Sequence, residues 1–488
     1  MGSILAAPPT DGTPWRPAPI PEPDRVVLHG NSEAFEAAAA LGTEAWHARG
    51  WDGTGVKIAV FDVQWEQLEQ PVHARELGTF TTHDCWAHPS CGPAMDSRRP
   101  RFGFERGAHG TACAEVIRDL APGVELYLVR VNALTTFENA LSWAARNDID
   151  LISMSLSFFN ESMYDGTGSV NDAMDRLAGT DTLLVTSAGN YATEHWREAF
   201  LDTDRDGWHE FEGGAEQLEV RYAPGSARAT LIWNDFDNCG DTDLDIYAVD
   251  GEGRVLGRAG ARQVAGADDC APVERLSLTV DRDRPVYLKV HHAGGSPNAV
   301  IDLMARGGDT VIPHPWGSVT DPGTHPAAFT VGAVRGTSAY TRLGPESFSS
   351  WGPTGSGLPK PDIAGPDGLS SSVYGVTGFY GTSASTPAVA AAIALVMSRY
   401  PELSPREAAA WLADHAMTEQ DVGDPPDPAL GAGRARLPPP GAGTAACGSR
   451  FATLPLGLLL APWAGLRRRR HRPLPSDAPS ATLRPSPE

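Results

Sequence analysis

Three short segments of the sequence hold a carboxylate, an imidazole and a hydroxyl in an order that could support hydrolysis. Asp62 ends the apolar run VKIAVFD, His109 opens HGTACAEVI, and Ser383 lies in GTSASTP. A serine becomes a nucleophile when a neighbouring imidazole takes its proton, and a carboxylate holds that imidazole in the useful tautomer. Each residue alone is more often structural, so the prediction of nucleophilic catalysis rests on the three together.

The segments around these residues predict the elements that position them. Asp62 is expected at the carboxyl end of a buried strand, where its side chain can reach a crevice. His109 is expected to open a helix, with Gly110 allowing another backbone to approach closely. Ser383 immediately precedes a stretch that is apolar on nearly every helical face. The positive end of such a helix favours developing negative charge.

The wider pattern predicts an α/β fold. Buried strands are expected at residues 56–62, 124–131, 149–157, 181–190 and 327–334, and helices at 137–147, 171–179, 385–400 and 404–416. Strands that alternate with helices indicate a parallel sheet with helical crossovers. Residues 200–308 instead show turn signals and almost no helical periodicity, which predicts an inserted all-β sandwich.

The motifs resemble those of the subtilisin-like serine proteases, the subtilases. The resemblance covers roughly residues 41–195 and 311–416, and it is carried by WDGTGVKIAVFD, HGTACAEVI, DIDLISMSLS, LLVTSAGN, FSSWGP, KPDIAGP and GTSASTPAVAA. It implies that Ser383 is the nucleophile, that His109 is the general base, and that Asp62 orients and stabilises the imidazolium. It also implies that the Asn190 side chain and the Ser383 amide stabilise the oxyanion.

The same resemblance implies two substrate-binding segments. One is a strand that pairs with an extended peptide, and the other forms the base of the pocket for the residue before the scissile bond. Their residues are Ser153, Ser155, Leu156 and Ser157 in the first segment and Ser187, Ala188 and Gly189 in the second.

The sequence departs from the family pattern at several positions. Val63 and Gln64 follow Asp62, where the family usually has Ser or Thr and then Gly. Ser157 stands where glycine is common, which predicts a narrower or more polar pocket. Ala388 replaces a usual histidine. None of these changes removes a member of the triad.

The chain divides into seven predicted parts. In order they are a Pro-rich segment (1–40), the first part of the catalytic domain (41–195), the inserted sandwich (196–310), the second part of the catalytic domain (311–420), a Pro/Gly-rich linker (421–450), a short apolar segment with an Arg cluster (451–472) and a disordered tail (473–488). The sandwich resembles the jelly-roll domains that accompany many subtilases. The segment 451–472 resembles the sorting tags of some Gram-negative bacteria, which predicts transient membrane insertion; a compositionally biased tail is the alternative.

Cysteines and acidic residues suggest two stabilising features. Cys85 with Cys91 and Cys239 with Cys270 are expected to form disulfides, the alternative being four free thiols, and Cys113 is expected to be a buried free thiol. Carboxylates around Gly207 have the spacing of a calcium loop, although a solvated acidic turn is the alternative. The predicted ligands are Asp202, Asp204, Asp206 and Glu210. No cofactor is expected for catalysis.

Composition and motifs together favour an exported, extracellular or surface serine endopeptidase that acts as a monomer. The 488-residue chain has 39 Lys and Arg against 61 Asp and Glu, a formal net charge of −22, which argues against a nucleic-acid partner. Disulfides also point to an oxidising compartment. Residues 1–7, however, lack a basic residue and do not predict a signal peptide. A cytosolic peptidase is therefore an alternative. The other alternative is a weak or inactive surface protein that binds through its sandwich.

Overall fold

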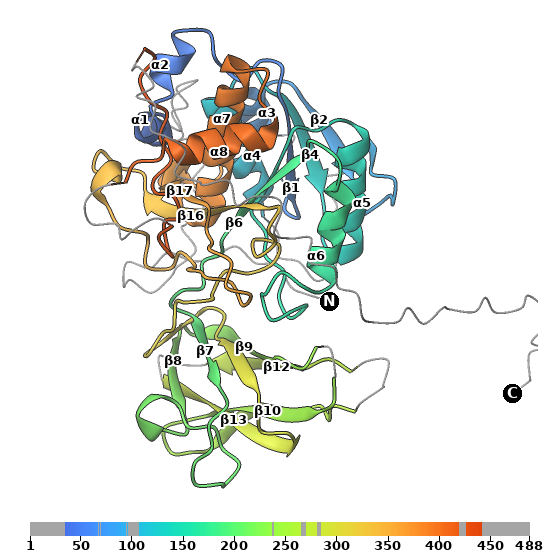
Figure 1. Cartoon of the computed structure of the whole chain (residues 1–488), viewed down its shortest axis with the longest axis vertical. Helices are drawn as coiled ribbons and strands as arrows, with labels where there is room; N and C mark the ends of the chain where they lie inside the picture. The colour runs from blue at the N-terminus through green and yellow to red at the C-terminus, as the bar shows by residue number, and fades with distance from the viewer. Residues whose placement is uncertain are drawn as a thin grey trace, which may run out of the picture. The chain divides into compact units, whose positions relative to one another are not determined.

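A mixed sheet forms the centre of the α/β part of the chain (Figure 1). The computed structural model describes residues 35–66, 68, 70–93, 95, 107–236, 239–264, 270–280, 285–418 and 426–441. Within these residues the sheet has eight strands, in the spatial order β17 (Ile363–Asp367), β16 (Phe329–Arg335), β6 (Leu183–Ser187), β5 (Leu151–Met154), β1 (Lys57–Asp62), β4 (Glu125–Arg130), β2 (Phe80–Asp84) and β3 (Gly92–Pro93). Every neighbouring pair is parallel except β2 with β3.

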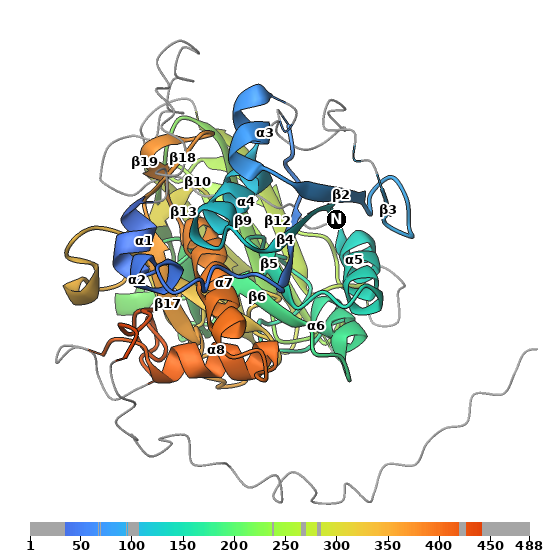
Figure 2. The same ribbon diagram turned by 90° about the horizontal axis from the view of Figure 1, so that it is seen from above.

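Helices cover this sheet and form two separate hydrophobic cores with it (Figure 2). One core includes residues of α1 (Phe35–Leu41), α2 (Glu44–His47), α3 (Pro71–Leu77), α4 (His109–Leu120), α7 (Thr382–Arg399) and α8 (Pro405–Asp414). The other includes residues of α5 (Leu134–Arg146), α6 (Ser169–Met174) and the short helix η1 (Asp175–Leu177). The parallel sheet and its helices confirm the predicted α/β class.

Helix α7 is the most deeply buried of the described helices of the α/β part, because its sequence is apolar on all sides. It packs closely on β17 at Gly365, where an added Cβ would lie 2.7 Å from Cγ2 of Val389 and 2.8 Å from the Ser385 carbonyl oxygen. The helix begins at Thr382 rather than at residue 385, so Ser383 lies inside its first turn instead of before it.

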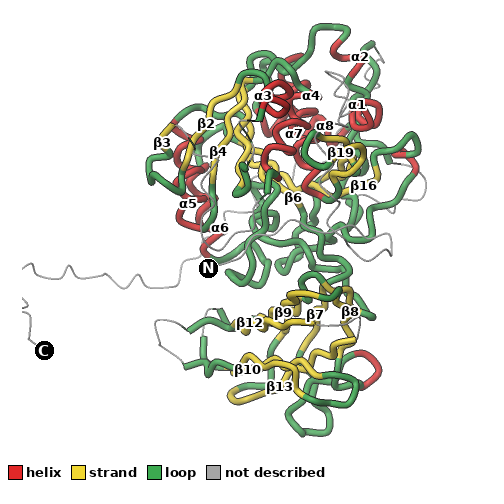
Figure 3. Tube along the Cα trace, turned by 180° about the vertical axis from the view of Figure 1, so that it is seen from behind, coloured by secondary structure: helices red, strands yellow, loops and turns green. Residues whose placement is uncertain are grey.

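Two antiparallel sheets follow, and they are formed by the segment between β6 and β16 (Figure 3). In the described chain one sheet has five strands, β11 (Val255–Ala259), β10 (Thr242–Val249), β13 (Pro285–Gly295), β8 (Leu218–Tyr222) and β15 (Gly308–Thr310). The other has four strands, β12 (Val273–Val280), β9 (Gly225–Trp233), β14 (Val300–Met304) and β7 (His195–Ala199). Their inward-facing side chains share one hydrophobic core. Short elements complete the chain: η2 (Glu212–Gly214), η3 (Tyr340–Arg342), and the hairpin β18 (Leu369–Ser371) and β19 (Gly375–Phe379).

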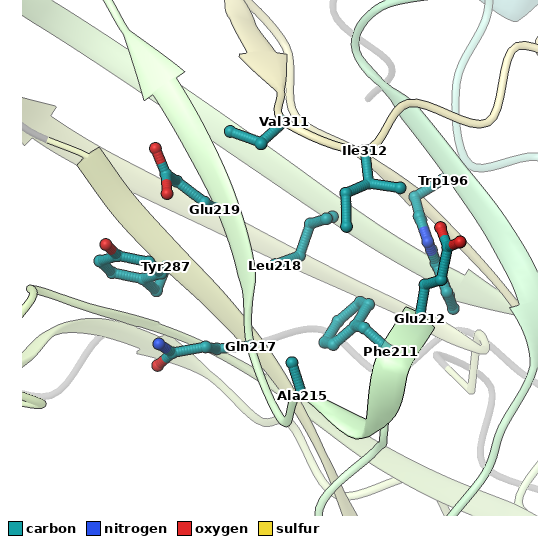
Figure 4. Close-up of a pocket in the computed structure, with 10 residues that line it drawn as sticks. All are labelled: Trp196, Phe211, Glu212, Ala215, Gln217, Leu218, Glu219, Tyr287, Val311 and Ile312. Carbon is teal, nitrogen blue, oxygen red and sulfur yellow. The ribbon is translucent and has the colours of Figure 1, made fainter.

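The sandwich also contains a cavity of about 210 Å³ with a mainly apolar lining (Figure 4). Trp196, Phe211, Leu218 and Ile312 contribute to its walls. All of its lining residues come from positions 196–312, so neither Asp62 nor His109 contributes to its walls.

The prediction of a linker over residues 421–450 is wrong for residues 426–441, which pack against the α/β part. Residues 426–441 are described, and Arg434 forms backbone bridges with both Ala364 and Met417. Leu437 is only 1% exposed, and its amide bonds to the Leu41 carbonyl. The Pro-rich composition suggested an extended connection, but long-range backbone pairing with β17 holds this segment against the α/β part.

The sequence also predicted the parts at the two ends of the chain, residues 1–40 and 451–488. Helix α1 covers Phe35–Leu41, so helical structure is present before the expected boundary at residue 41. The apolar segment with its Arg cluster (451–472) and the tail (473–488) lie outside the described residues. Among the helices that are described, none combines the length and the hydropathy needed to cross a membrane.

Both predicted disulfides are present in the structure. They join Cys85 to Cys91 and Cys239 to Cys270. Cys113 is a buried free thiol, as expected from its position in an apolar helix.

Candidate active site

Asp62 and His109 form a buried pair, as the sequence predicted. Oδ2 of Asp62 lies 2.7 Å from Nδ1 of His109. The other carboxylate oxygen accepts the amides of Val63 at 2.8 Å and Gln64 at 2.9 Å. The two residues that depart from the family pattern therefore still fix the carboxylate through their backbone, whatever their side chains.

Gly110 allows this pair to form. A Cβ at this position would lie 2.6 Å from Cβ of Asp62 and 2.9 Å from the Trp65 ring. The missing side chain lets the first turn of α4 lie against the end of β1, which brings the His109 ring to the carboxylate.

The environment of His109 raises its pKa. Burial lowers the pKa, but the Asp62 charge, the interaction with Cys113 and the hydrogen bond to Asp62 outweigh burial and place it well above 6.5. The ring meets Phe379 edge-on at a centroid distance of 5.7 Å. Its Nε2 atom is buried and has no hydrogen-bond partner among the described residues, so this nitrogen is free to serve as a base.

Ser383 lies in the first turn of α7, where amides have no carbonyl partner within the helix. Four residues later, Pro387 has no N–H to donate to the Ser383 carbonyl. That carbonyl instead accepts the Ser155 hydroxyl at 3.0 Å and lies 3.6 Å from the Cys113 thiol. The backbone of Ser383, the predicted nucleophile, is therefore bonded to the predicted peptide-binding segment and contacts the helix of His109.

Asn190 lies next to this turn, as expected for an oxyanion donor. Its Oδ1 accepts both the amide and the hydroxyl of Thr382 at 2.9 Å. Because the oxygen is occupied in this way, the amide NH₂ remains as the donor. Gly381, with a φ of +104°, leaves room for this NH₂, since an added Cβ would lie 2.9 Å from Nδ2.

Two further residues act on the site, although the sequence did not assign them a role. Cys113 lies one helical turn after His109, with Sγ 4.0 Å from Nδ1. Its spacing of four residues places both side chains on one face of α4, a signal that could have linked them. Asp367 accepts the Gly381 amide at 3.0 Å. Burial and the nearby charge of Glu346 raise the pKa of Asp367 to about 8, and no motif marks this residue.

The two predicted substrate segments lie on neighbouring strands of the sheet. Ser153 pairs with Val185 in the register of β5 and β6, and Ser155 to Ser157 continue beyond the end of β5. Ser187 ends β6, and the Ala188 amide bonds to the Val331 carbonyl. All seven predicted residues are buried.

The acidic loop does not bring its four predicted ligands to one point. Ligand oxygens of Asp202, Asp204 and Glu210 lie within 4.8 Å of one another, whereas Asp206 groups with Asp204 and Glu216. Both oxygens of Asp202 also accept backbone amides from Arg205 to Gly207. Asp206 therefore does not join the group that Asp202, Asp204 and Glu210 form, although the sequence predicted all four as ligands of one ion.

Comparisons with known proteins identify the family and the fold of this chain. The profile described as the Subtilase family matches residues 53–433. The minor extracellular protease Vpr of Bacillus subtilis (strain 168) is 26% identical over 442 residues, which cover 81% of this chain and 52% of Vpr. This chain therefore spans about half the length of that relative. The CspB protease of Clostridium perfringens has the same fold, with a TM-score of 0.59, 14% identity, and coverage of 83% of this chain and 97% of its own. Because the profile matches most of the sequence, the chain belongs to the subtilase family.

Proposed function

We propose that this subtilase is a serine endopeptidase that cleaves extended polypeptides through Ser383, His109 and Asp62. The observation that carries the proposal is the buried 2.7 Å contact between Asp62 and Nδ1 of His109, beside a buried Nε2 that has no partner among the described residues. Cys113 contacts both the His109 ring and the Ser383 carbonyl, which supports the placement of base and nucleophile in one site.

The first half of the reaction acylates the serine. Asp62 holds the proton on Nδ1, so Nε2 can take the proton of Ser383 as its oxygen attacks the peptide carbonyl. The Asn190 NH₂ and the Ser383 amide donate to the oxygen that becomes negative. His109 then gives its proton to the leaving amine, and the acyl group stays on Ser383.

The second half releases the acyl group. A water molecule replaces the amine, His109 takes its proton, and the hydroxide attacks the ester. The same two donors stabilise the second oxyanion. His109 returns the proton to Ser383, which restores the starting state.

A fluorophosphonate label tests this proposal directly. The reagent phosphonylates only a serine that a neighbouring base activates. We expect the full chain to gain one label, with peptide mapping by mass spectrometry placing it on Ser383. Heat-denatured protein is the control and should gain none. A native chain that remains unlabelled would favour the alternative of a non-catalytic surface protein.

The pH dependence of cleavage should reflect the raised pKa of His109. Only the neutral imidazole can accept the serine proton, so kcat/KM should rise with pH through a pKa above the ordinary 6.5. The raised pKa of His109 also stabilises the folded protein, but this effect depends on pH in the opposite direction. The stabilisation is complete below the pKa that the histidine has in the unfolded chain, and it is lost as the pH rises through its pKa in the folded protein. Initial rates from pH 5 to 10 measure the first effect, and melting curves at each pH separate it from unfolding. If kcat/KM instead rises with a pKa at or below 6.5, the raised pKa of His109 is contradicted.

We also propose that the acidic loop binds a structural calcium ion through Asp202, Asp204 and Glu210. Carboxylate oxygens are the ligands that calcium prefers, and Gly207 permits the turn with a φ of +93°. The Asp206 amide lowers the pKa of Asp204, but desolvation and the surrounding carboxylates outweigh it and leave the pKa raised. A bound cation would relieve that repulsion.

Calcium should raise the melting temperature, because it binds the native loop and not the unfolded chain. We expect the shift between calcium and chelator to disappear in Asp204→Ala. It should persist in Asp241→Ala, which removes another exposed aspartate of the sandwich. Equal shifts in both variants would exclude this loop as the binding site.

We further propose that the enzyme is exported and acts as a monomer on polypeptides rather than on nucleic acid. Its two disulfides support an oxidising compartment, and its net charge of −22 opposes binding to a phosphate backbone. Transient membrane insertion of residues 451–472 remains a prediction from the sequence.

A further inference from the structure

Two buried hydroxyl groups meet where the predicted specificity pocket should be deepest. Oγ1 of Thr320 donates to Oγ of Ser157 across 2.9 Å. Ser157 ends the first substrate segment and is 6% exposed, whereas Thr320 comes from the loop before β16 and is 1% exposed. The position at which the family commonly has glycine therefore has a side chain, and that side chain contacts a second one.

The loop that carries Thr320 is fixed to both substrate segments. The Thr320 amide donates to the Ala188 carbonyl at 3.3 Å, and the Asp321 carbonyl accepts the Phe158 amide at 2.9 Å. The buried carboxylate of Asp321 accepts hydrogen bonds from Ser162 at 2.6 Å, from Asn171 at 2.8 Å and from Thr324. Thr320 is consequently held in place and cannot swing away without breaking several buried hydrogen bonds.

Tyr191 fills the adjoining space. Its ring lies against Gly189, where an added Cβ would come within 2.6 Å of Cδ2 and Cε2. The ring also packs edge-on against Phe159 at 5.1 Å, two residues after Ser157. Three hydroxyl-bearing side chains thus occupy the region between the two substrate segments.

We propose that Ser157, Thr320 and Tyr191 close the base of the specificity pocket, so that the enzyme cleaves after Gly, Ala or Ser. This inference rests on the proposed endopeptidase function and names the substrate class of the same site. A methyl or hydroxymethyl group fits above the hydroxyl pair. A Leu or Phe side chain would have to displace Thr320, whose loop is anchored by Asp321.

The expected discrimination is large. One methylene group in a closed pocket changes kcat/KM by about 10- to 200-fold, so the several extra carbons of Leu or Phe should cost at least about 10-fold. The Thr320 hydroxyl donates to Ser157, and neither residue carries a charge that could pair with a charged substrate side chain.

The experiment compares fluorogenic peptides that differ only at the residue before the scissile bond. The full wild-type chain should show kcat/KM values for Ala and Ser at least about 10-fold above those for Leu and Phe. Thr320→Gly should raise the Phe-to-Ala ratio by about 10-fold or more, because it opens the base. Ser157→Gly opens the base of the specificity pocket from the first substrate segment, and it provides a second measurement of the Phe-to-Ala ratio if Thr320→Gly does not fold.

Thr320→Val is the matched control. Valine has nearly the shape of threonine and places a methyl group where the hydroxyl was, so the pocket stays filled while the hydrogen bond to Ser157 is lost. The wild-type preference for small residues should therefore persist in Thr320→Val, while it weakens in Thr320→Gly.

Outcomes separate this inference from the function on which it rests. If Ser383 takes the fluorophosphonate label but wild type prefers Leu or Phe, the closed pocket is wrong and the endopeptidase stands. An unchanged ratio in both folded glycine variants also overturns the closed pocket. If neither labelling nor cleavage occurs, the proposed function and this inference fail together.

Discussion

Ser383→Ala should lower kcat for peptide hydrolysis by about 10⁶-fold, the scale of loss for an activated serine nucleophile. Alanine has no oxygen to attack the carbonyl, and the acyl-enzyme cannot form. Hydrolysis of an unfolded protein substrate by the purified chain measures the loss, and fluorophosphonate labelling should disappear with it. The residual rate should reflect only the Asn190 and backbone donors.

Ser398→Ala provides the control from the same helix. Its hydroxyl bonds to the Leu395 carbonyl near the other end of α7, far along the helix from the first turn. We expect this variant to retain the wild-type rate. Wild-type cleavage by purified Ser383→Ala would contradict the assignment of the nucleophile.

Asp62→Asn should lower kcat by about 10⁴-fold while the fold persists. The asparagine NH₂ would donate to Nδ1 of His109, which moves the ring proton to Nε2 and leaves no base for the serine. The two amides that bind Oδ1 of Asp62 can still bind the asparagine oxygen, so the side chain should keep its position.

Asp150→Asn is the matched control for this change. Its carboxylate accepts the Lys57 amide at 2.8 Å, at the opposite end of β1. Melting curves should show both variants folded, and only Asp62→Asn should lose activity. Similar activities in Asp62→Asn and wild type would refute the proposed role of the carboxylate.

The parts of the site that follow from local pattern were predictable. The apolar run that ends at Asp62 predicted a strand at residues 56–62, and β1 in the structure covers Lys57–Asp62. His109 was expected to open a helix and does so in α4. Asp62, His109 and Asn190 could be assigned because their motifs are short and ordered along the chain.

Features that depend on distant packing could not be predicted. Contact of Cys113 with the Ser383 carbonyl requires α4 to lie against α7, and it joins residues 270 positions apart. Thr320 lies in a loop without a motif, and its contact with Ser157 spans 163 positions. In residues 426–441, Pro and Gly suggested an unpacked linker because composition says nothing about backbone pairing with a distant strand.

The acidic loop shows a third kind of limit. The spacing of Asp202, Asp204 and Asp206 at alternate positions predicted that all three bind the same calcium ion. The loop's own hydrogen bonds to the Asp202 carboxylate set a turn that directs Asp206 toward a second group. Spacing identified the residues involved, but local backbone geometry decided which of them converge.

Insertion of the sandwich between the two halves of the catalytic part has a consequence for folding kinetics. The Asn190 side chain meets Thr382 across 192 positions of sequence, with nine sandwich strands of the described chain in between. Closing such a long loop costs entropy before any contact repays it, and contacts of high sequence separation form slowly. The two groups that are predicted to stabilise the oxyanion should therefore come together only after the intervening strands have formed. We therefore expect a newly made chain to lack the assembled site during much of its folding, and on the proposed mechanism this delay would limit self-cleavage while unfolded segments are exposed.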